Sequence, residues 1–335
     1  MNAAKDEREY EYPYIENADE KLKDFCTKGL DARYNGEKRD RAEARLNEEL
    51  DIIRRQGSTS GYLTLLDVLN TVGFEPGDIS IRGTNASSLV VYVTGLSNVD
   101  PLETKPALYP EFYFGFDGER LPGFEMNVTP ELQDRLLDYY EHYSGELHLA
   151  YRYDTDVFAT LGVFMGDFDE DKVKDSLYYG VFRFLFIRMG ERNRQPSEFI
   201  REDIIKACNP KTYKDYVKCF GLAHGTGVWE ENAEKLLKEG ILLPSELIAD
   251  REDVYEYLLQ HGFEKRTAFE ITESVRKGRI KRVGWKPEQL EAMREKEVPE
   301  WFIESCKKIQ YLFPRAHSMG YLKTYCNMDP EKKDS

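Results

Sequence analysis

The sequence lacks any long apolar run. No stretch reaches the roughly 18 apolar residues that a membrane-spanning helix needs, so we expect no transmembrane helix and no membrane partner. The first 14 residues, MNAAKDEREYEYPY, are charged and have no apolar centre, which predicts that no secretory signal peptide is present.

Cysteine is scarce, and its five copies are scattered. No two of them form a Cys-X-X-Cys pair, the spacing common in zinc and redox motifs. An odd, dispersed set predicts reduced thiols and a cytoplasmic location. Each cysteine is most simply interpreted as a small buried apolar side chain. They are Cys26, Cys208, Cys219, Cys306 and Cys326.

Basic residues are not in excess either. The chain carries 47 lysines and arginines against 62 aspartates and glutamates, for a net charge of −15. This balance argues against a uniformly basic nucleic-acid-binding protein but leaves room for a local basic patch. Apolar residues make up 41% of the 335, which excludes a mostly disordered chain and suffices for one large domain or two to three ordinary ones.

Short catalytic and metal-binding motifs are absent from the sequence. It contains no Walker loop, no HExxH, no GxSxG and no zinc-ligand pattern. The acidic run Asp167–Asp175 lacks the ligand spacing and the glycine of a calcium loop, so we interpret it as a solvated loop or helix start. His224 lies in a sharp loop without a Cys, Ser or Asp partner at a recognisable spacing, and we assign it a structural role.

Helical periodicity marks both ends of the chain, and strand signals lie between them. Apolar residues recur at helical spacing in 17–34 and 41–56. Residues 147–153 alternate as in a half-buried strand, whereas 89–93 fits either a strand or a buried helix. The pattern predicts an α+β centre followed by a helical C-terminal half. Helices are expected there at 232–239, 253–261 and 267–277, from Pro287, and from Pro299 through Phe313.

Long segments of the C-terminal half resemble one family. They are GLAHGTGVWEENAEKLL (221–237), RKG (276–278) and VPEWFIESCKKIQYLFPRAH (298–317). All three are similar to the fingers subdomain of the PolC-type DNA polymerase III alpha subunit, a bacterial family C replicative polymerase. The resemblance implies a mostly helical fingers-like region.

The N-terminal half resembles the same family more loosely and in the same order. Residues 14–25 and 42–53 are similar to the helices before the family's palm. IRGTNASSL (81–89), LSNVDPL (96–102) and FYFGFDGERLPGFEMNV (112–128) are similar to palm segments. The resemblance therefore implies a truncated and degenerate palm and fingers homologue.

The resemblance also implies a domain order. We expect a lead-in and helix over 1–40, a degenerate palm-like region over 41–165, a shortened connector over 166–197, a fingers-like region over 198–322 and a polar tail over 323–335.

Several catalytic groups of the family have no counterpart here. Two-metal nucleotidyl transfer needs carboxylate ligands, and the family takes two aspartates from an Asp-Ile-Asp motif on one palm strand. Here the triplet reads Gly123-Phe124-Glu125, so the first carboxylate is absent and Glu125 is vestigial. The family's third aspartate and its triphosphate-binding stretch also have no match. We expect no catalytic residue, no metal site and no cofactor, with Mg²⁺ required only if residual activity exists.

Two groups of binding candidates survive. The turn after Ile81 carries hydroxyls and backbone N–H groups that suit phosphate, although an ordinary turn is the alternative. Its nucleotide- and phosphate-binding candidates are Arg82, Gly83, Thr84, Ser87 and Ser88. The DNA-binding candidates are cations, five of them within 276–282, where a solvated helix end is the alternative. They are Arg276, Lys277, Arg279, Lys281, Arg282, Lys307, Lys308, Arg315 and His317.

Three functions are compatible with these residues. The first is a non-catalytic, polymerase-derived protein of DNA replication that binds DNA or replisome proteins. The second is a residual DNA-directed nucleotidyltransferase, in which Glu119, Glu125 and Asp154 converge on a rearranged metal site. The third is a protein-interaction module without a nucleic-acid role, which the net charge favours. The lost carboxylates place the second well behind the other two.

Overall fold

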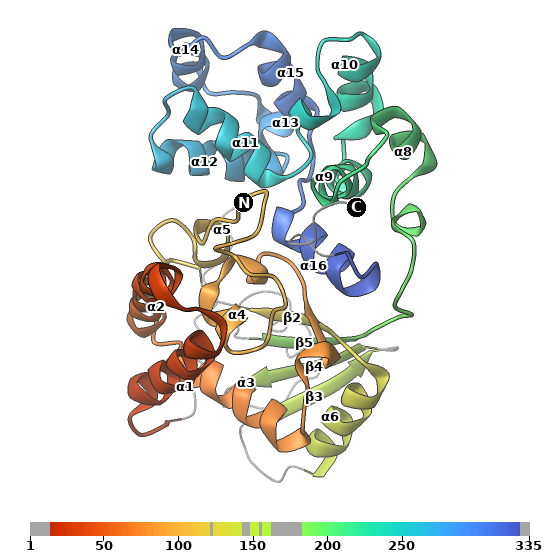
Figure 1. The fold of residues 1–335 in the computed structure, drawn as a ribbon. Helices are drawn as coiled ribbons and strands as arrows, with labels where there is room; N and C mark the ends of the chain where they lie inside the picture. The colour runs from red at the N-terminus through yellow and green to blue at the C-terminus, as the bar shows by residue number, and fades with distance from the viewer. Residues whose placement is uncertain (1–13, 121–122, 143–147, 154–155, 162–182, 329–335) are drawn as a thin grey trace. The chain divides into compact units, whose positions relative to one another are not determined.

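The computed structural model describes residues 14–120, 123–142, 148–153, 156–161 and 183–328 (Figure 1). The chain divides into two compact units. The first comprises residues 1–98 and 113–190, and the second comprises residues 99–112 and 191–335. The acidic run 167–175 and Asp154 lie outside the described residues.

Three helices open the first unit: α1 (Ala18–Arg33), α2 (Gly36–Arg55) and α3 (Thr59–Val72). The periodic apolar residues that predicted the first two are buried, as Leu22 on α1 and Leu46 on α2 show. Helix α1 also lies close to the short helix α4 (Leu89–Val93), because a Cβ added to Gly29 would lie only 2.0 Å from the Val93 carbonyl oxygen.

The sheet of the first unit has five strands in the order β1-β2-β5-β4-β3. Strands β2 and β5 are parallel and the other neighbours are antiparallel. The segment predicted as a strand at 147–153 is β3, while 89–93 is helical. The strands are β1 (Ile79–Ile81), β2 (Phe124–Val128), β3 (His148–Tyr153), β4 (Asp156–Leu161) and β5 (Arg183–Arg188), and α6 (Pro130–His142) follows β2.

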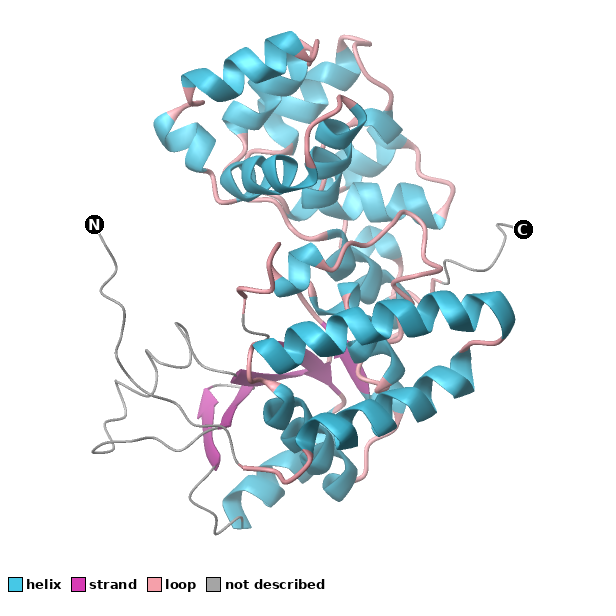
Figure 2. Cartoon of the chain, turned by 90° about the vertical axis from the view of Figure 1, so that its left-hand side faces the viewer, coloured by secondary structure: helices cyan, strands magenta, loops and turns pink. Residues whose placement is uncertain are grey.

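The second unit is built from helices, and in the described part of the chain all named strands belong to the first unit (Figure 2). The helices expected at 253–261, 267–277 and from Pro287 are present. Along the chain, the boundary between the two units falls within helix α5 (Glu111–Phe114). The others are α8 (Glu202–Cys208), α9 (Tyr213–His224), α10 (Glu234–Lys238), α11 (Arg251–Gln260), α12 (Lys265–Arg276), α13 (Arg279–Val283), α14 (Pro287–Glu295), α15 (Glu300–Lys308) and α16 (Arg315–Tyr325).

The helix predicted from Pro299 through Phe313 is wrong at its end. Helix α15 stops at Lys308, and the next residues are extended, with Tyr311 forming an isolated bridge to Thr226. The reason is that the backbone N–H groups of Gln310 and Tyr311 donate to the Thr226 carbonyl instead of continuing the helix. Pro314 precedes the new helix α16.

The α+β class predicted from the sequence is confirmed by this combination of a five-stranded sheet with many helices. Within the described ranges, no helix has the length and apolar character needed to cross a membrane.

Candidate functional site

The triplet Gly123-Phe124-Glu125 lies at the start of β2. Phe124 is fully buried and meets Tyr62 of α3 edge-on, with ring centroids 5.2 Å apart. Because side chains alternate along a strand, Glu125 points to the other face, where it is partly exposed. Gly123 contributes only its carbonyl, which accepts a hydrogen bond from the Asn85 side-chain amide at 2.8 Å. Glu125 is therefore the one carboxylate that this triplet provides.

The candidate phosphate-binding turn follows β1 and is hydrogen-bonded to the neighbouring strand β2. The Arg82 N–H donates to the Glu125 carbonyl at 2.8 Å, and Gly83 turns the chain with a φ of +64°. Thr84 then precedes a short 3₁₀ turn over Asn85–Ser87. The structure thus places the backbone of Arg82, the first residue of the turn, beside the backbone of the vestigial Glu125.

Three buried polar side chains near this turn have an atom without a hydrogen-bond partner among the residues that the structure describes. They are Ser80 on β1, Asn127 on β2 and Ser87 at the end of the turn, each at most 1% exposed. Ser80 and Asn127 lie opposite one another in the β1–β2 register. A buried polar group without a partner destabilises the folded state by about 1–3 kcal/mol, so these polar atoms lower the stability of this part of the first unit.

Ser88 has a structural partner that sequence reasoning missed. Its hydroxyl donates to the Glu49 carboxylate at 2.7 Å, and the backbone N–H groups of Leu89 and Val90 donate to the same carboxylate at 3.0 Å each. Glu49 is 1% exposed and pairs with Arg45 at 2.7 Å. An internal carboxylate therefore fills the N-terminus of α4, the kind of place where a helix binds anions.

The alternative metal site is not assembled by the residues that the structure describes. Glu119 lies in an exposed turn, where its carboxylate accepts the Asp117 N–H at 2.8 Å. Asp154 lies outside the described residues. In the described ranges, no group of three or more His, Cys, Asp and Glu side chains is arranged to hold a metal ion.

The basic segment 276–282 is only partly engaged within the chain. Arg276 makes two 2.6 Å bonds to the Glu273 carboxylate, and Lys277 pairs with the same group at 3.5 Å. Arg279, Lys281 and Arg282 are exposed on α13, and no ion pair of these three is found in the described part of the chain. The exposed charge of the segment is thus concentrated on α13.

Lys307 and Lys308 end α15 and each has a partner. Lys307 forms an ion pair with Glu304 one turn earlier, and Lys308 donates to the Glu231 carbonyl at 2.6 Å. Both remain accessible, with Lys308 the more exposed.

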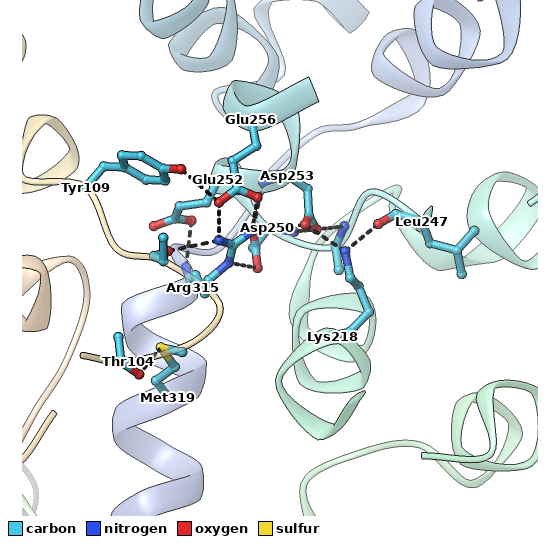
Figure 3. Close-up of polar contacts among 12 residues, drawn as sticks. Thr104, Tyr109, Lys218, Leu247, Asp250, Glu252, Asp253, Glu256, Arg315 and Met319 are labelled. Carbon is cyan, nitrogen blue, oxygen red and sulfur yellow. Dashed lines mark hydrogen bonds and ion pairs between the residues drawn. The ribbon is translucent and has the colours of Figure 1, made fainter. Parts of the chain in front are cut away.

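Arg315 is buried within the second unit, at 1% exposure. Figure 3 shows its side chain among those of Asp250, Asp253 and Glu256. Its guanidinium binds Asp250 at 3.0 Å, Asp253 at 3.0 Å and Glu256 at 2.7 Å. It also donates to the Ala107 carbonyl at 2.9 Å. These carboxylates raise the pKa of Arg315 against the opposing effect of its burial. The residue lies inside the unit, so it adds no charge to an exposed basic face.

The acids around Arg315 differ in their pKa because their partners differ. Burial raises the pKa of Asp250 to about 6 and that of Glu252 to about 8. Glu252 accepts the Arg315 backbone N–H at 2.9 Å, while its other oxygen has no hydrogen-bond partner in the described ranges. Burial disfavours the charged form of Asp253, but the positive charges of Lys218 and Arg315 outweigh this effect and lower its pKa. We call Asp250, Glu252, Asp253, Glu256 and Arg315 the arginine cluster.

His317 and the tryptophans also belong to the interior more than to a surface. His317 is 6% exposed and packs against Phe313 and Tyr321, with ring centroids 5.2 and 4.8 Å apart. Trp229 and Trp285 are buried, and the Trp229 indole donates to Asp203 at 3.0 Å. These rings pack within the unit, so the prediction that His317 is a surface DNA-binding residue is wrong.

Comparisons with known proteins confirm the predicted resemblance. Residues 20–159 match the family described as the bacterial DNA polymerase III alpha NTPase domain. The chain is 42% identical over 126 residues to a DNA polymerase III PolC-type of Caldanaerobacter subterraneus subsp. tengcongensis, and 44% identical over 126 residues to one of Staphylococcus aureus. These matches span 38% of this chain but only 9% and 8% of the two relatives.

Proposed function

We propose that this PolC-type DNA polymerase III alpha-like chain, related to DNA replication, lacks polymerase activity and acts by binding DNA. The observation that carries the proposal is Gly123, directly before β2, at the position where the family motif has its first aspartate. On this proposal the first unit is a degenerate palm-like body and the second unit is fingers-like.

Loss of catalysis rests on the chemistry of the metal ligands. Two divalent ions beside one another need several carboxylate oxygens to offset their charge. The triplet supplies the single carboxylate of Glu125, and Gly123 has no side chain to offer a second. No cofactor is needed for the remaining role, so binding should persist in EDTA.

DNA binding rests on the charge of α13. Arg279, Lys281 and Arg282 are exposed on a five-residue helix, against an overall net charge of −15. Exposed cations gain free energy from DNA by releasing condensed counterions, which makes such binding salt-dependent. Lys277, Lys307 and Lys308 add further exposed cations, so these six residues form the proposed DNA-binding set.

A second, smaller site is proposed at the turn after β1. Arg82, Gly83, Thr84 and Ser87 are the candidates for a nucleotide phosphate, and the unpartnered Ser87 hydroxyl supports this site. Ser88 is committed to Glu49 and is expected to contribute nothing. Saturation-transfer NMR with a nucleoside triphosphate should show binding that Ser87→Ala weakens and Ser97→Ala leaves unchanged.

A cytoplasmic location fits the proposal, since the five cysteines are all free thiols. Replisome proteins are the alternative partners, and capture of a replisome protein without any DNA binding would favour a protein-interaction module.

The test is a titration of fluorescent primer–template DNA with the 335-residue chain at two salt concentrations. The triple variant R279E/K281E/R282E should weaken binding at least about tenfold and reduce the salt slope by about one per cation removed. The matched control, K211E/K235E/K265E, changes the net charge by the same amount at exposed lysines elsewhere in the second unit. Absence of binding at low salt, or an equal loss in both triple variants, would refute the proposal.

A further inference from the structure

Two cysteines of the second unit lie side by side. Cys208 is the last residue of α8 and is partly exposed, whereas Cys219 lies within α9 and is 1% exposed. Each thiol is the largest influence on the pKa of the other. They also line one small pocket, of about 20 Å³, together with Lys214, Asp215 and Lys218. This volume is enough for a molecule the size of water.

The two thiols of the pair are not equivalent. The neighbouring Cys219 thiol lowers the pKa of Cys208, and Lys218 adds to this effect, while burial and Asp215 oppose it. The Cys208 thiol and burial raise the pKa of Cys219. The Asp215 carboxylate is itself engaged by the N–H groups of Lys211 and Thr212 at 3.0 and 2.9 Å. The accessible sulfur is therefore the better nucleophile and the buried one keeps its proton.

Cys208 lies at a helix end, where the chain changes direction. Asn209 follows it in the left-handed conformation, with a φ of +47°, and Pro210 comes next. Helix α8 therefore ends at the reactive cysteine. A disulfide needs the two sulfurs at about 2.05 Å, so the two side chains must come together for the bond to form.

We propose that Cys208 and Cys219 are a peroxide-sensitive thiol pair that closes reversibly into a disulfide. In the first step the Cys208 thiolate attacks one oxygen of hydrogen peroxide, the O–O bond breaks, and the departing hydroxide takes a proton to leave as water. Cys208 is now a sulfenic acid. In the second step the Cys219 sulfur attacks the Cys208 sulfur, the S–O bond breaks, and the Cys219 proton leaves with hydroxide as a second water. A low-molecular-weight dithiol reverses the reaction by exchange.

Cys326 provides an internal control within the same unit. It is also partly exposed, but burial raises its pKa to about 11. Exposure alone therefore predicts similar reactivity for Cys208 and Cys326, whereas the thiol pair predicts that Cys208 reacts much faster.

The experiment treats the wild-type chain with hydrogen peroxide, blocks free thiols with iodoacetamide, and maps tryptic peptides by mass spectrometry. Lysines at 206, 211, 218 and 235 place Cys208 in peptide 207–211 and Cys219 in peptide 219–235. We expect a linked pair of these peptides, about 2 Da lighter than their sum, that dithiothreitol releases. Without peroxide, iodoacetamide should modify Cys208 at least about tenfold faster than Cys326 at neutral pH.

Two variants assign the roles within the pair. C219S should leave Cys208 as a sulfenic acid that dimedone traps, whereas C208S should leave Cys219 unmodified. The wild-type rate comparison needs no variant, so it stands even if either substitution affects folding. The proposal fails if Cys208 reacts no faster than Cys326, or if wild-type oxidation yields no linked peptide.

Discussion

Glu49 and Ser88 are joined by a 2.7 Å hydrogen bond across 39 residues of sequence. The same carboxylate accepts the first N–H groups of α4, so it acts as a built-in anion at a helix N-terminus. In the sequence, the Ser88 hydroxyl is a candidate for binding phosphate. In the fold it bonds to Glu49 instead, and this contact holds α4 to α2.

Replacing Glu49 should therefore destabilise the chain. Glu49→Ala leaves the Leu89 and Val90 N–H groups without their acceptor and removes the partner of Arg45. We expect a loss of about 3–5 kcal/mol in the free energy of unfolding, since buried ionic partners are being separated. Urea denaturation followed by far-UV circular dichroism measures it. Glu48→Ala, at an exposed position on the same helix, should change stability by less than about 0.5 kcal/mol. Equal effects of the two substitutions would contradict the role of Glu49.

Close packing of α1 and α4 at Gly29 gives a second prediction. In an open helix, Gly→Ala stabilises by about 0.5–1 kcal/mol. Here the new Cβ would lie 2.0 Å from the Val93 carbonyl oxygen, so we expect Gly29→Ala to destabilise by about 1–3 kcal/mol. Gly190→Ala, which meets nothing within 4 Å, is the control for thermal unfolding. A higher melting temperature for Gly29→Ala would show that the two helices are not in contact.

The pH dependence of the second unit should reflect Glu252. Its pKa is near 4.5 in the unfolded chain and about 8 in the fold, so the folded unit keeps a proton that the unfolded chain releases. Stability from this group is therefore fully present below pH 4.5 and is lost as the pH rises to about 8, by at most about 1.4 kcal/mol per pH unit. Asp250 acts in the same direction up to about pH 6, while Asp253, with a lowered pKa, acts in the opposite direction in acid.

Glu252→Gln isolates this contribution, because glutamine resembles the protonated acid and does not titrate. All three tryptophans lie in the second unit, so their fluorescence during urea denaturation reports on that unit alone. We expect the variant to match the wild type near pH 5 and to exceed its stability near pH 8. An unchanged pH profile would mean that Glu252 is ionised in the fold.

Arg315 should be essential to the stability of the second unit. Arg315→Met leaves the acids of the arginine cluster buried without their cation, which costs about 3–5 kcal/mol. Arg279→Met, on the exposed face of α13, should stay within about 0.5 kcal/mol of the wild type. Tryptophan fluorescence in urea compares the two. A similar stability for both variants would place Arg315 outside the core.

Sequence periodicity predicted the helices and strands that depend on residues close to one another in the sequence. The helices α1 and α2 follow from apolar periodicity, and strand β3 follows from its alternation. The ambiguous stretch 89–93 became a helix because Ser88 caps it and Glu49 holds its first turn. The hydrogen bond from Leu89 to Glu49 joins residues about 40 positions apart, and no local sequence pattern predicts it.

Arg315 shows the same limit at the candidate site. Its sequence context, among other cations after α15, favoured a surface role. Its partners Asp250, Asp253 and Glu256 lie 59 to 65 positions earlier, and only the fold brings them together. One signal was available, since a capping box at Asp250–Asp253 predicts acids clustered at the start of α11.

The central claim is that the chain has kept a polymerase-like fold without its metal-binding carboxylates. Primer extension on a primed template, with magnesium or manganese and all four deoxynucleotides, tests it most directly. We predict no product longer than the primer at any protein concentration that saturates the DNA. Extension that is present in the wild type and abolished by Glu125→Gln would show that catalysis survives, and would contradict the account.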